Sequence, residues 1–276
     1  MSGRVSLASR GSERLAGRRR TRYHRAILAS IFLVFAFFAA VVYGLQQSAV
    51  RISHIEIFGA DASLAAYAAD AMRGWYLGIV PRDSTFFFPE GSIRASILAA
   101  DRSIAAVSIF RSGLTGLSIK VDSRTGIARW CFSTGSGEAS TSVTQAGCYV
   151  FDANGFIFSA ATSTTQTINA FTLYAPLVGD ASGPLGASIA DAEQLPATFD
   201  FARQLATLGS PVSSIVIHDG EVDDYLASGT RITYVLGNEQ NAFTALVSAH
   251  GNFNLADGSV TYVDLRFNGK VYVKKK

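Results

Sequence analysis

The chain has 276 residues, of which 49% are hydrophobic and only 16% are charged, a low charged fraction for a soluble protein. The length allows two small domains, or one larger domain with appendages. Residues 1–25 hold eight arginines and one acid, although the whole chain has 24 basic and 21 acidic side chains. This distribution of charge excludes a chain that is basic throughout, and it indicates a basic tail followed by a mildly acidic body.

The basic tail, residues 1–25, has two possible roles. The cluster Arg18-Arg19-Arg20, with Arg22 beside it, is of the kind that forms nucleic-acid arms. The cluster stops at Arg25, however, and an uncharged stretch begins at once. We therefore interpret the tail as a topology signal that contacts anionic lipids, and we expect no nucleic-acid partner.

Residues 26–45 (AILASIFLVFAFFAAVVYGL) predict a single transmembrane helix, because they contain no charge and no proline. Twenty residues at about 1.5 Å each span roughly 30 Å, the thickness of a hydrocarbon core. The arginines before them predict a cytoplasmic N-terminus and extracytoplasmic C-terminal domains. The alternative is a cleaved signal peptide. The 25-residue leader, the long apolar run and the lack of a small-x-small site after Leu45 favour an uncleaved anchor.

Residues 50–122 predict a small α+β domain. A strand is expected over 51–58 (RISHIEIF), where polar and apolar residues alternate. Helices are expected at about 61–73 and from Ser92 onward, and a loop with Gly78, Pro81 and Pro89 separates them. Further strands follow over 105–111 and 117–122, so that two helices would cover one face of a three-stranded sheet in the order β-α-α-β-β.

Residues 123–276 predict a mostly antiparallel β-domain with two helices, which completes an α+β fold. We expect strands over 127–132, 148–151 and 156–159, with a turn at Asp152–Gly155 between the last two. A strand over 171–178 and a mobile Gly/Ser-rich segment over 179–190 come next. Further expected elements are a helix over 198–208, strands over 212–218, 222–227 and 230–236, and a helix over 238–249 with Phe243, Leu246, Val247 and His250 on one face.

The last predicted strand covers 260–267, and two arrangements are open after it. Asn268-Gly269 is the strongest two-residue hairpin signal and would return the chain over 270–273. The same pair could instead form a bulge in one long edge strand.

Cys131 and Cys148 flank a Gly/Ser/Thr-rich stretch, and each adjoins an aromatic, strand-like run. Two antiparallel strands joined by that loop could bring the thiols together, and an oxidising compartment would then join them. A metal pair or a redox centre is the alternative, but neither a CxxC motif nor a nearby histidine supports it. A structural disulfide is favoured.

No catalytic or metal-binding pattern stands out. None of the four histidines has a partner at i+3 or i+4 with which to share a metal, and no P-loop or nucleophile elbow occurs. Asp152-x-Asn154-Gly155 lacks the remaining ligands of a calcium loop, and the adjacent Asp223 and Asp224 face opposite ways on a strand. We expect no enzymatic activity, no cofactor and no metal.

Three stretches together carry a resemblance to a known family. They are Ile55–Gly59 (IEIFG), Val107–Trp130 and Tyr262–Phe267 (YVDLRF), and the segment Tyr149–Gly155 adds an aspartate-turn-glycine hairpin. In this order and spacing they resemble the FtsQ/DivIB family of bacterial cell-division proteins. The family often has glutamate where Ser123 stands and proline where Gly126 stands, and the cysteine pair is not a general family feature.

The resemblance implies a POTRA domain over 50–122 and an FtsQ-type β-domain over 123–276. It also implies a single-pass scaffold in the cytoplasmic membrane at the division septum, without enzymatic activity. Such a scaffold holds FtsB/DivIC-like and FtsL-like single-span proteins through its β-domain and other divisome components through its POTRA domain. The competing function classes are a membrane-anchored POTRA-type transport or assembly factor and an anchored cell-wall hydrolase.

The expected binding mode is addition of a partner strand to the terminal edge of the β-domain. Because the chain ends shortly after the strand over 260–267, we expect that strand to be the open edge. Along it, Val263, Leu265 and Phe267 should face inward, and Tyr262, Asp264 and Arg266 should face outward to solvent. The alternative is a core strand with a solvated face. The positions implied in partner binding are Tyr262, Asp264, Arg266, Phe267, Val271 and Tyr272.

Overall fold

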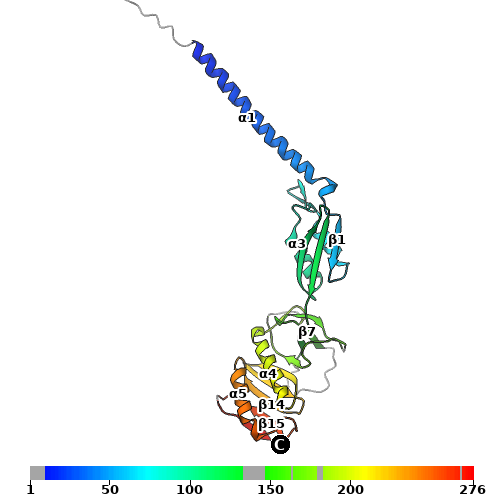
Figure 1. Cartoon of the computed structure of the whole chain (residues 1–276), viewed down its shortest axis with the longest axis vertical. Helices are drawn as coiled ribbons and strands as arrows, with labels where there is room; N and C mark the ends of the chain where they lie inside the picture. Colours follow the sequence, from blue (N-terminus) through cyan, green and yellow to red (C-terminus); the bar gives the residue numbers. More distant parts are fainter. Residues whose placement is uncertain (1–9, 133–146, 163, 179–182, 268) are drawn as a thin grey trace, which may run out of the picture. The chain divides into compact units, whose positions relative to one another are not determined.

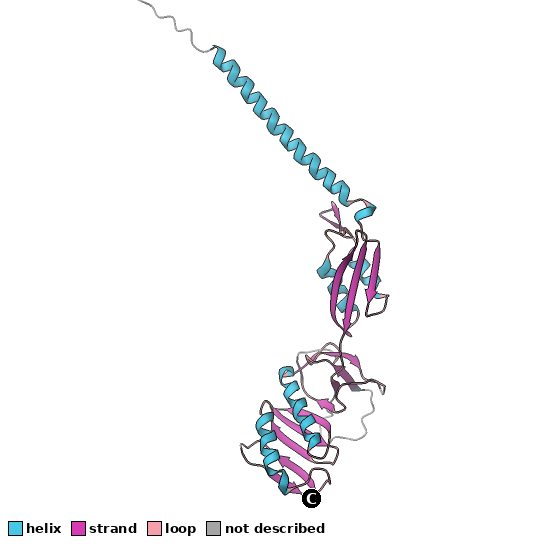
Figure 2. Cartoon of the chain, in the orientation of Figure 1, coloured by secondary structure: helices cyan, strands magenta, loops and turns pink. Residues whose placement is uncertain are grey.

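The computed structural model describes residues 10–132, 147–162, 164–178, 183–267 and 269–276, with side chains from Tyr23 onward. The chain is an α+β protein with a long N-terminal helix and a C-terminal body made mostly of sheet (Figures 1 and 2). Two compact units are present. The first contains residues 1–100 and 106–121, and the second contains residues 101–105 and 122–276.

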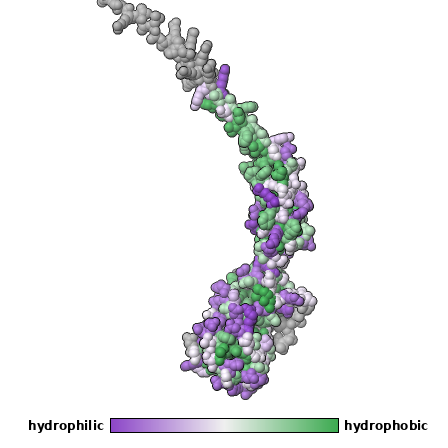
Figure 3. Space-filling view, in the orientation of Figure 1, coloured by the Kyte–Doolittle hydropathy of each residue, from purple (hydrophilic) through white to green (hydrophobic). Residues whose placement is uncertain are grey.

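Helix α1 (Arg10–Leu45) is the longest element. Its part Tyr23–Leu45 is long and apolar enough to cross a membrane, and none of its most apolar window is buried against protein (Figure 3). A lone exposed helix of this composition indicates a membrane anchor. The helix begins well before the predicted residue 26, because the arginine-rich tail has no proline to stop it.

The first unit places two helices on a three-stranded sheet with the order β1-β5-β4, in which β1 and β5 are parallel. Its core joins the helices to alternate residues of β5, and the buried set includes Ile93, Ile97, Leu117 and Ile119. The predicted loop between the helices contains a short hairpin, β2–β3, which the sequence analysis missed. The elements are β1 (His54–Phe58), α2 (Leu64–Ala71), β2 (Trp75–Tyr76), β3 (Val80–Pro81), α3 (Glu90–Ala100), β4 (Ile104–Ser112) and β5 (Gly116–Ser123).

The second unit is built on a nine-stranded sheet with the order β16-β15-β14-β13-β12-β9-β6-β7-β8. Most neighbours are antiparallel, but β9 runs parallel to both β6 and β12, and β14 runs parallel to β15. The strands are β6 (Ala128–Cys131), β7 (Cys148–Phe151), β8 (Ile157–Ala160), β9 (Thr172–Tyr174), β12 (Val212–His218), β13 (Glu221–Leu226), β14 (Arg231–Val235), β15 (Val260–Asp264) and β16 (Tyr272–Lys275).

Helices α4 (Leu195–Thr207) and α5 (Glu239–Ala249) lie over this sheet (Figure 2). Helix α4 has its apolar residues at helical spacing, so that Leu195, Phe199, Ala202 and Leu205 are all buried. On α5, Ala242 and Leu246 face the core. The prediction that Val247 shares this face was wrong, since its side chain is exposed.

The predicted strand over 171–178 is broken in two. Pro176 cannot donate a backbone hydrogen bond, and the sheet strand β9 ends before it at Tyr174. Beyond it, β10 (Leu177–Val178) pairs with β11 (Ser188–Ile189) in a separate small sheet. The prediction of a mobile segment over 179–190 was therefore wrong for its last part, where Ala187 and Ile189 are buried, while residues 179–182 lie outside the described part.

The chain reverses after β15, so the hairpin is the alternative that the structure adopts. Strand β15 ends at Asp264, and β16 returns antiparallel to it. The connection runs over 265–271 and is longer than the two-residue turn that the Asn-Gly pair predicts. Gly269 takes a positive φ of 68°, and Asn268 lies outside the described residues.

Candidate partner-binding site

The two ends of the nine-stranded sheet differ in their protection. At the β8 end, the amide of Ile157 donates to the Ala187 carbonyl at 2.9 Å, and the amide of Gly186 donates to the Ile157 carbonyl at 2.8 Å. At the other end, β16 pairs with β15 on one side, and no further strand of the described chain adds to its outer side. The open edge is therefore β16.

This assignment corrects the predicted edge. The strand over 260–267 was expected to be the edge, but β16 covers β15 with the pairs Tyr262↔Lys274 and Asp264↔Tyr272. The sequence signal for the reversal was present in Asn268-Gly269, but it did not distinguish a hairpin from a bulge. Of the six predicted positions, only Tyr272 is on the open strand, and Val271 comes just before it.

An exposed aromatic pair lies at the start of β16. The rings of Phe267 and Tyr272 have centroids 5.4 Å apart in an edge-to-face arrangement, and their residues are 52% and 53% exposed. Phe267 was expected to face inward. That prediction was wrong because strand alternation stops with β15 at Asp264, and Leu265 alone continues into the core.

A network of charged side chains holds the segment that follows β15. The Arg266 guanidinium donates to Asp264 through Nε (3.0 Å to Oδ1) and Nη2 (2.7 Å to Oδ2), and to Glu221 through Nη1 (3.0 Å to Oε2). The Arg266 amide also donates to Asp264 Oδ1 at 3.1 Å, and the Tyr262 hydroxyl donates to Oδ2 at 3.0 Å.

Asp264 was predicted to face solvent, but it is only 6% exposed. Its carboxylate is tolerated there because charge-assisted hydrogen bonds replace water. The Arg266 guanidinium holds the pKa of Asp264 below its ordinary value, and Asp264 in turn raises the pKa of Arg266. The fork-like guanidinium thus fixes residues 264–266, and with them the position of Phe267.

Two further residues of this site were missed by the sequence analysis. Glu221 on β13 accepts from Arg266, and the Arg231 guanidinium on β14 lies 4.6 Å from the centre of the Tyr262 ring. Arg231 stands opposite Tyr262 because β14 and β15 are parallel neighbours. No local signal in the sequence pairs these strands, so these contacts depend on the fold.

The open edge is surrounded by basic side chains and lies beside a groove. Lys270 lies between the two aromatic residues in sequence, and Lys274, Lys275 and Lys276 follow them. An open groove of about 700 Å³ lies beside the start of β16, between the outward face of α5 and the preceding connection. Its lining includes Asn241, Thr244, Ala245, Ser248, Gly269 and Val271.

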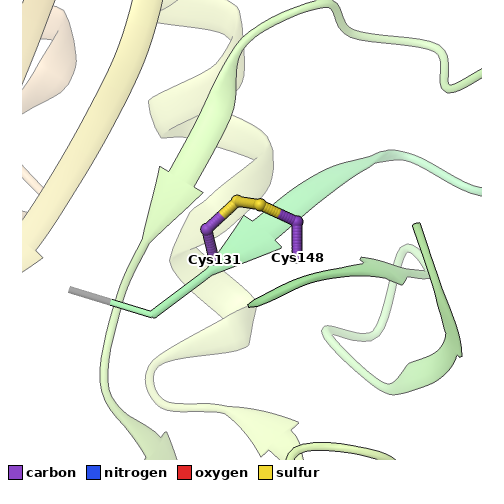
Figure 4. The surroundings of a disulfide bond; sticks show 2 residues. All are labelled: Cys131 and Cys148. Carbon is purple, nitrogen blue, oxygen red and sulfur yellow. A yellow bond between two sulfur atoms is a disulfide. The ribbon is translucent and has the colours of Figure 1, made fainter. Parts of the chain in front are cut away.

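Near the β8 end of the strand order, Cys131 and Cys148 are joined by a disulfide (Figure 4). They stand directly opposite each other on β6 and β7, with Cα atoms 4.2 Å apart. The bridge lies far along the strand order from β16, and the residues 133–146 that it encloses are outside the described part. It joins the end of β6 to the start of β7.

In the described part of the chain, no three His, Cys, Asp or Glu side chains form a group that could hold a metal ion. No model of a known protein family and no curated protein matches the sequence.

Proposed function

We propose that this chain is a membrane-anchored scaffold of the bacterial divisome, of the FtsQ/DivIB type, and that it binds a single-span partner by strand addition at β16. The observation that carries the proposal is the open β16 edge with the exposed Phe267–Tyr272 pair beside it. An edge strand offers unpaired backbone donors and acceptors at alternate residues, and adjacent side chains select the partner.

The site has the parts that such recognition needs. The four residues of β16 provide a backbone template of about 13 Å. The aromatic pair provides apolar area for an anchor side chain, since aromatic residues carry much of the binding energy of interfaces. The groove along α5 has room for a second segment of the same partner, such as a short helix joined to the added strand.

The lysines around β16 define the charge of that partner. A strand that pairs with the edge must lie among Lys270, Lys274 and Lys275, so acidic residues favour binding and basic residues oppose it. We therefore expect FtsB/DivIC-like and FtsL-like proteins to present an acidic, partly apolar segment to this edge. Binding should weaken as salt screens the attraction.

Other features support the remaining parts of the proposal. Apart from the short β2–β3 hairpin between its helices, the first unit has the order β-α-α-β-β, which is compatible with a POTRA domain through which further divisome components would dock. The apolar helix and the arginine-rich tail support a single-pass protein with a cytoplasmic N-terminus that contacts anionic lipids. Location at the septum follows from the proposed partners.

A photocrosslinking amino acid placed at Tyr272 of the full chain in cells tests the proposal. We expect one small single-span division protein as the main adduct, and we expect a tagged chain to gather at the septum. The double variant Phe267→Lys/Tyr272→Lys should lose co-purification of that protein, because it removes the aromatic surface on which the partner's apolar anchor packs and would bury two charges there.

A matched control is available in the same unit. Ile168→Lys and Val178→Lys place two charges on apolar residues that are at least as exposed but lie away from the edge. This control should retain the partner. Equal loss in both double variants, or uniform fluorescence around the cell with no adduct at Tyr272, would refute the proposal.

A further inference from the structure

An apolar surface of the first unit is used neither by its core nor by the candidate site. It centres on the β2–β3 hairpin, where Trp75 is 51% exposed and Leu77 at the tip is 96% exposed. Ile79, Phe86 and Phe87 are also exposed, so five large apolar side chains occur within thirteen residues. Apolar surface concentrated in this way marks an interaction site.

The hairpin turn presents Leu77 at a conformational cost. Leu77 has a φ of 50° and Gly78 a φ of 71°, and the amide of Ile79 donates to the Tyr76 carbonyl at 3.0 Å. Positive φ at both central residues is typical of a type I′ turn, where asparagine is preferred before glycine. A leucine with positive φ and no packing partner is unfavourable in water, and such strain is typical of functional positions.

The hairpin is tied to the residues that follow helix α1. Arg51 Nη2 and Asp83 Oδ2 form an ion pair at 2.6 Å, and the Ile52 amide donates to the Asp83 carbonyl at 2.8 Å. The Thr85 amide donates to the Val50 carbonyl at 3.0 Å. Residues 46–50 span at most about 18 Å when extended, so the segment 79–87 is held near the point where the helix ends.

The chemistry of this surface matches a lipid headgroup region. Tryptophan and tyrosine, here Trp75 and Tyr76, are preferred where acyl chains meet headgroups. The Arg82 guanidinium lies 5.7 Å from the centre of the Tyr76 ring and offers a positive charge beside the apolar residues. The acids nearest to the hairpin in sequence, Asp70 and Asp83, are paired with Arg73 and Arg51, so they do not leave a free negative charge there.

We propose that the β2–β3 hairpin, with Phe86 and Phe87, inserts into the outer surface of the bilayer beside the spanning helix. Leu77 and Trp75 reach the acyl boundary, and Arg82 lies at the level of lipid phosphates. The first unit is thereby held against the membrane at its α1-proximal end rather than swinging freely on residues 46–50. This inference depends on α1 spanning a membrane, and it is independent of the proposed role in division.

The two tryptophans of the chain provide the test, because Trp130 is 3% exposed in the core of the second unit and Trp75 is at the hairpin. The full chain is placed in nanodiscs of phosphatidylcholine and phosphatidylglycerol with brominated acyl chains. Bromine should quench a large part of the emission of the native chain and little of that of Trp75→Phe. Iodide added to the water should quench little of the emission of either chain, because lipid shields Trp75 and the protein core shields Trp130.

Two variants distinguish membrane insertion from mere exposure. Trp75→Phe/Phe58→Trp moves the reporter to a position that is 52% exposed, close to the 51% of Trp75, at the far end of β1. The emission of the relocated tryptophan should be quenched by iodide but not by the lipid bromines. Leu77→Asn suits the turn better than leucine and removes the apolar tip, so it should reduce the bromine quenching of Trp75 without unfolding the hairpin.

Three results would overturn the proposal. Trp75 emission that iodide quenches freely and bromine does not would show that the hairpin lies in water. Protection from both quenchers would show that protein, such as a second copy of this chain, covers it instead. Unchanged bromine quenching in Leu77→Asn would show that the tip does not insert.

Discussion

Replacing Arg266 tests whether the charged network holds the start of the edge. Arg266→Met keeps the length of the side chain and removes every side-chain hydrogen bond from this position to Asp264 and Glu221. Asp264 would then keep only the Tyr262 hydroxyl and one backbone amide as donors in a nearly buried position. Arg266→Lys keeps the charge but cannot donate to both carboxylates with the geometry of the planar guanidinium.

The size of the effect follows from burial. Removing one partner of a fully buried ion pair costs about 3–5 kcal/mol. The Arg266 and Glu221 side chains are each about a third exposed, so water can replace part of what is lost. We therefore expect Arg266→Met to lower the free energy of unfolding by about 1–3 kcal/mol, and Arg266→Lys by about half as much.

The effect should also depend on pH in a defined direction. Hydrogen bonding to Arg266 lowers the pKa of Asp264 in the folded chain. A lowered pKa stabilises the fold above the unfolded pKa, near 4, and this contribution is lost as the pH falls through the folded value. The difference between the native chain and Arg266→Met should therefore be largest near neutral pH and shrink on acidification.

Urea unfolding of the full chain in detergent measures both quantities. Trp130 reports on the second unit when Trp75 is replaced by phenylalanine, and in that background the chain that keeps Arg266 is compared with Arg266→Met and Arg266→Lys at each pH. A cost below about 0.5 kcal/mol at neutral pH would refute the assigned role of the network, since that is the range of ordinary surface substitutions. A difference that grows on acidification would refute the assigned cause.

Two further predictions concern the core of the second unit. Burial raises the pKa of Asp224 well above its ordinary value, so the equilibrium constant for folding should fall about tenfold for each pH unit as the pH rises from the unfolded to the folded pKa. Asp224→Asn should flatten this slope in urea unfolding at about pH 5 and pH 8, and an unchanged slope would contradict the assignment. Removing the bridge by Cys131→Ala/Cys148→Ala should lower the free energy of unfolding by about 3 kcal/mol for this 17-residue separation. Peptide mass spectrometry without reduction should find the two cysteines joined in the native chain. Two free thiols would contradict the disulfide.

The elements that the sequence predicted well are those with strong local patterns. The alternation over 117–122 sets Leu117, Ile119 and Val121 on the buried face of β5, as predicted. Apolar spacing after Pro196 likewise identifies α4, although that helix begins earlier, at Leu195. Where apolar residues recur with the period of the helix or strand, one stretch of sequence is enough to predict which of its side chains are buried.

The candidate site was predicted only in part because its geometry depends on distant strands. Which strand is the edge is decided by the reversal after β15, and the hairpin and the bulge share one sequence signal. Asp264 is buried because Arg266 and Tyr262 surround its carboxylate, and Arg266 is held by Glu221, 45 residues earlier. From sequence alone, a polar residue on a strand is predicted to face solvent unless the charged residues that surround it are known.

The lysines of the edge decide between two ways of covering it. Copies of a membrane-anchored chain share one surface, so an open edge would readily pair with the same edge of a neighbour. Such a pair would set the Tyr272–Lys275 strands of both chains side by side and gather Lys274, Lys275 and Lys276 of each chain along one short ladder. Like charges opposed across strands are destabilising, whereas an acidic strand would neutralise the same lysines. The charge of β16 therefore favours a different protein over a second copy, as the proposed scaffold role requires.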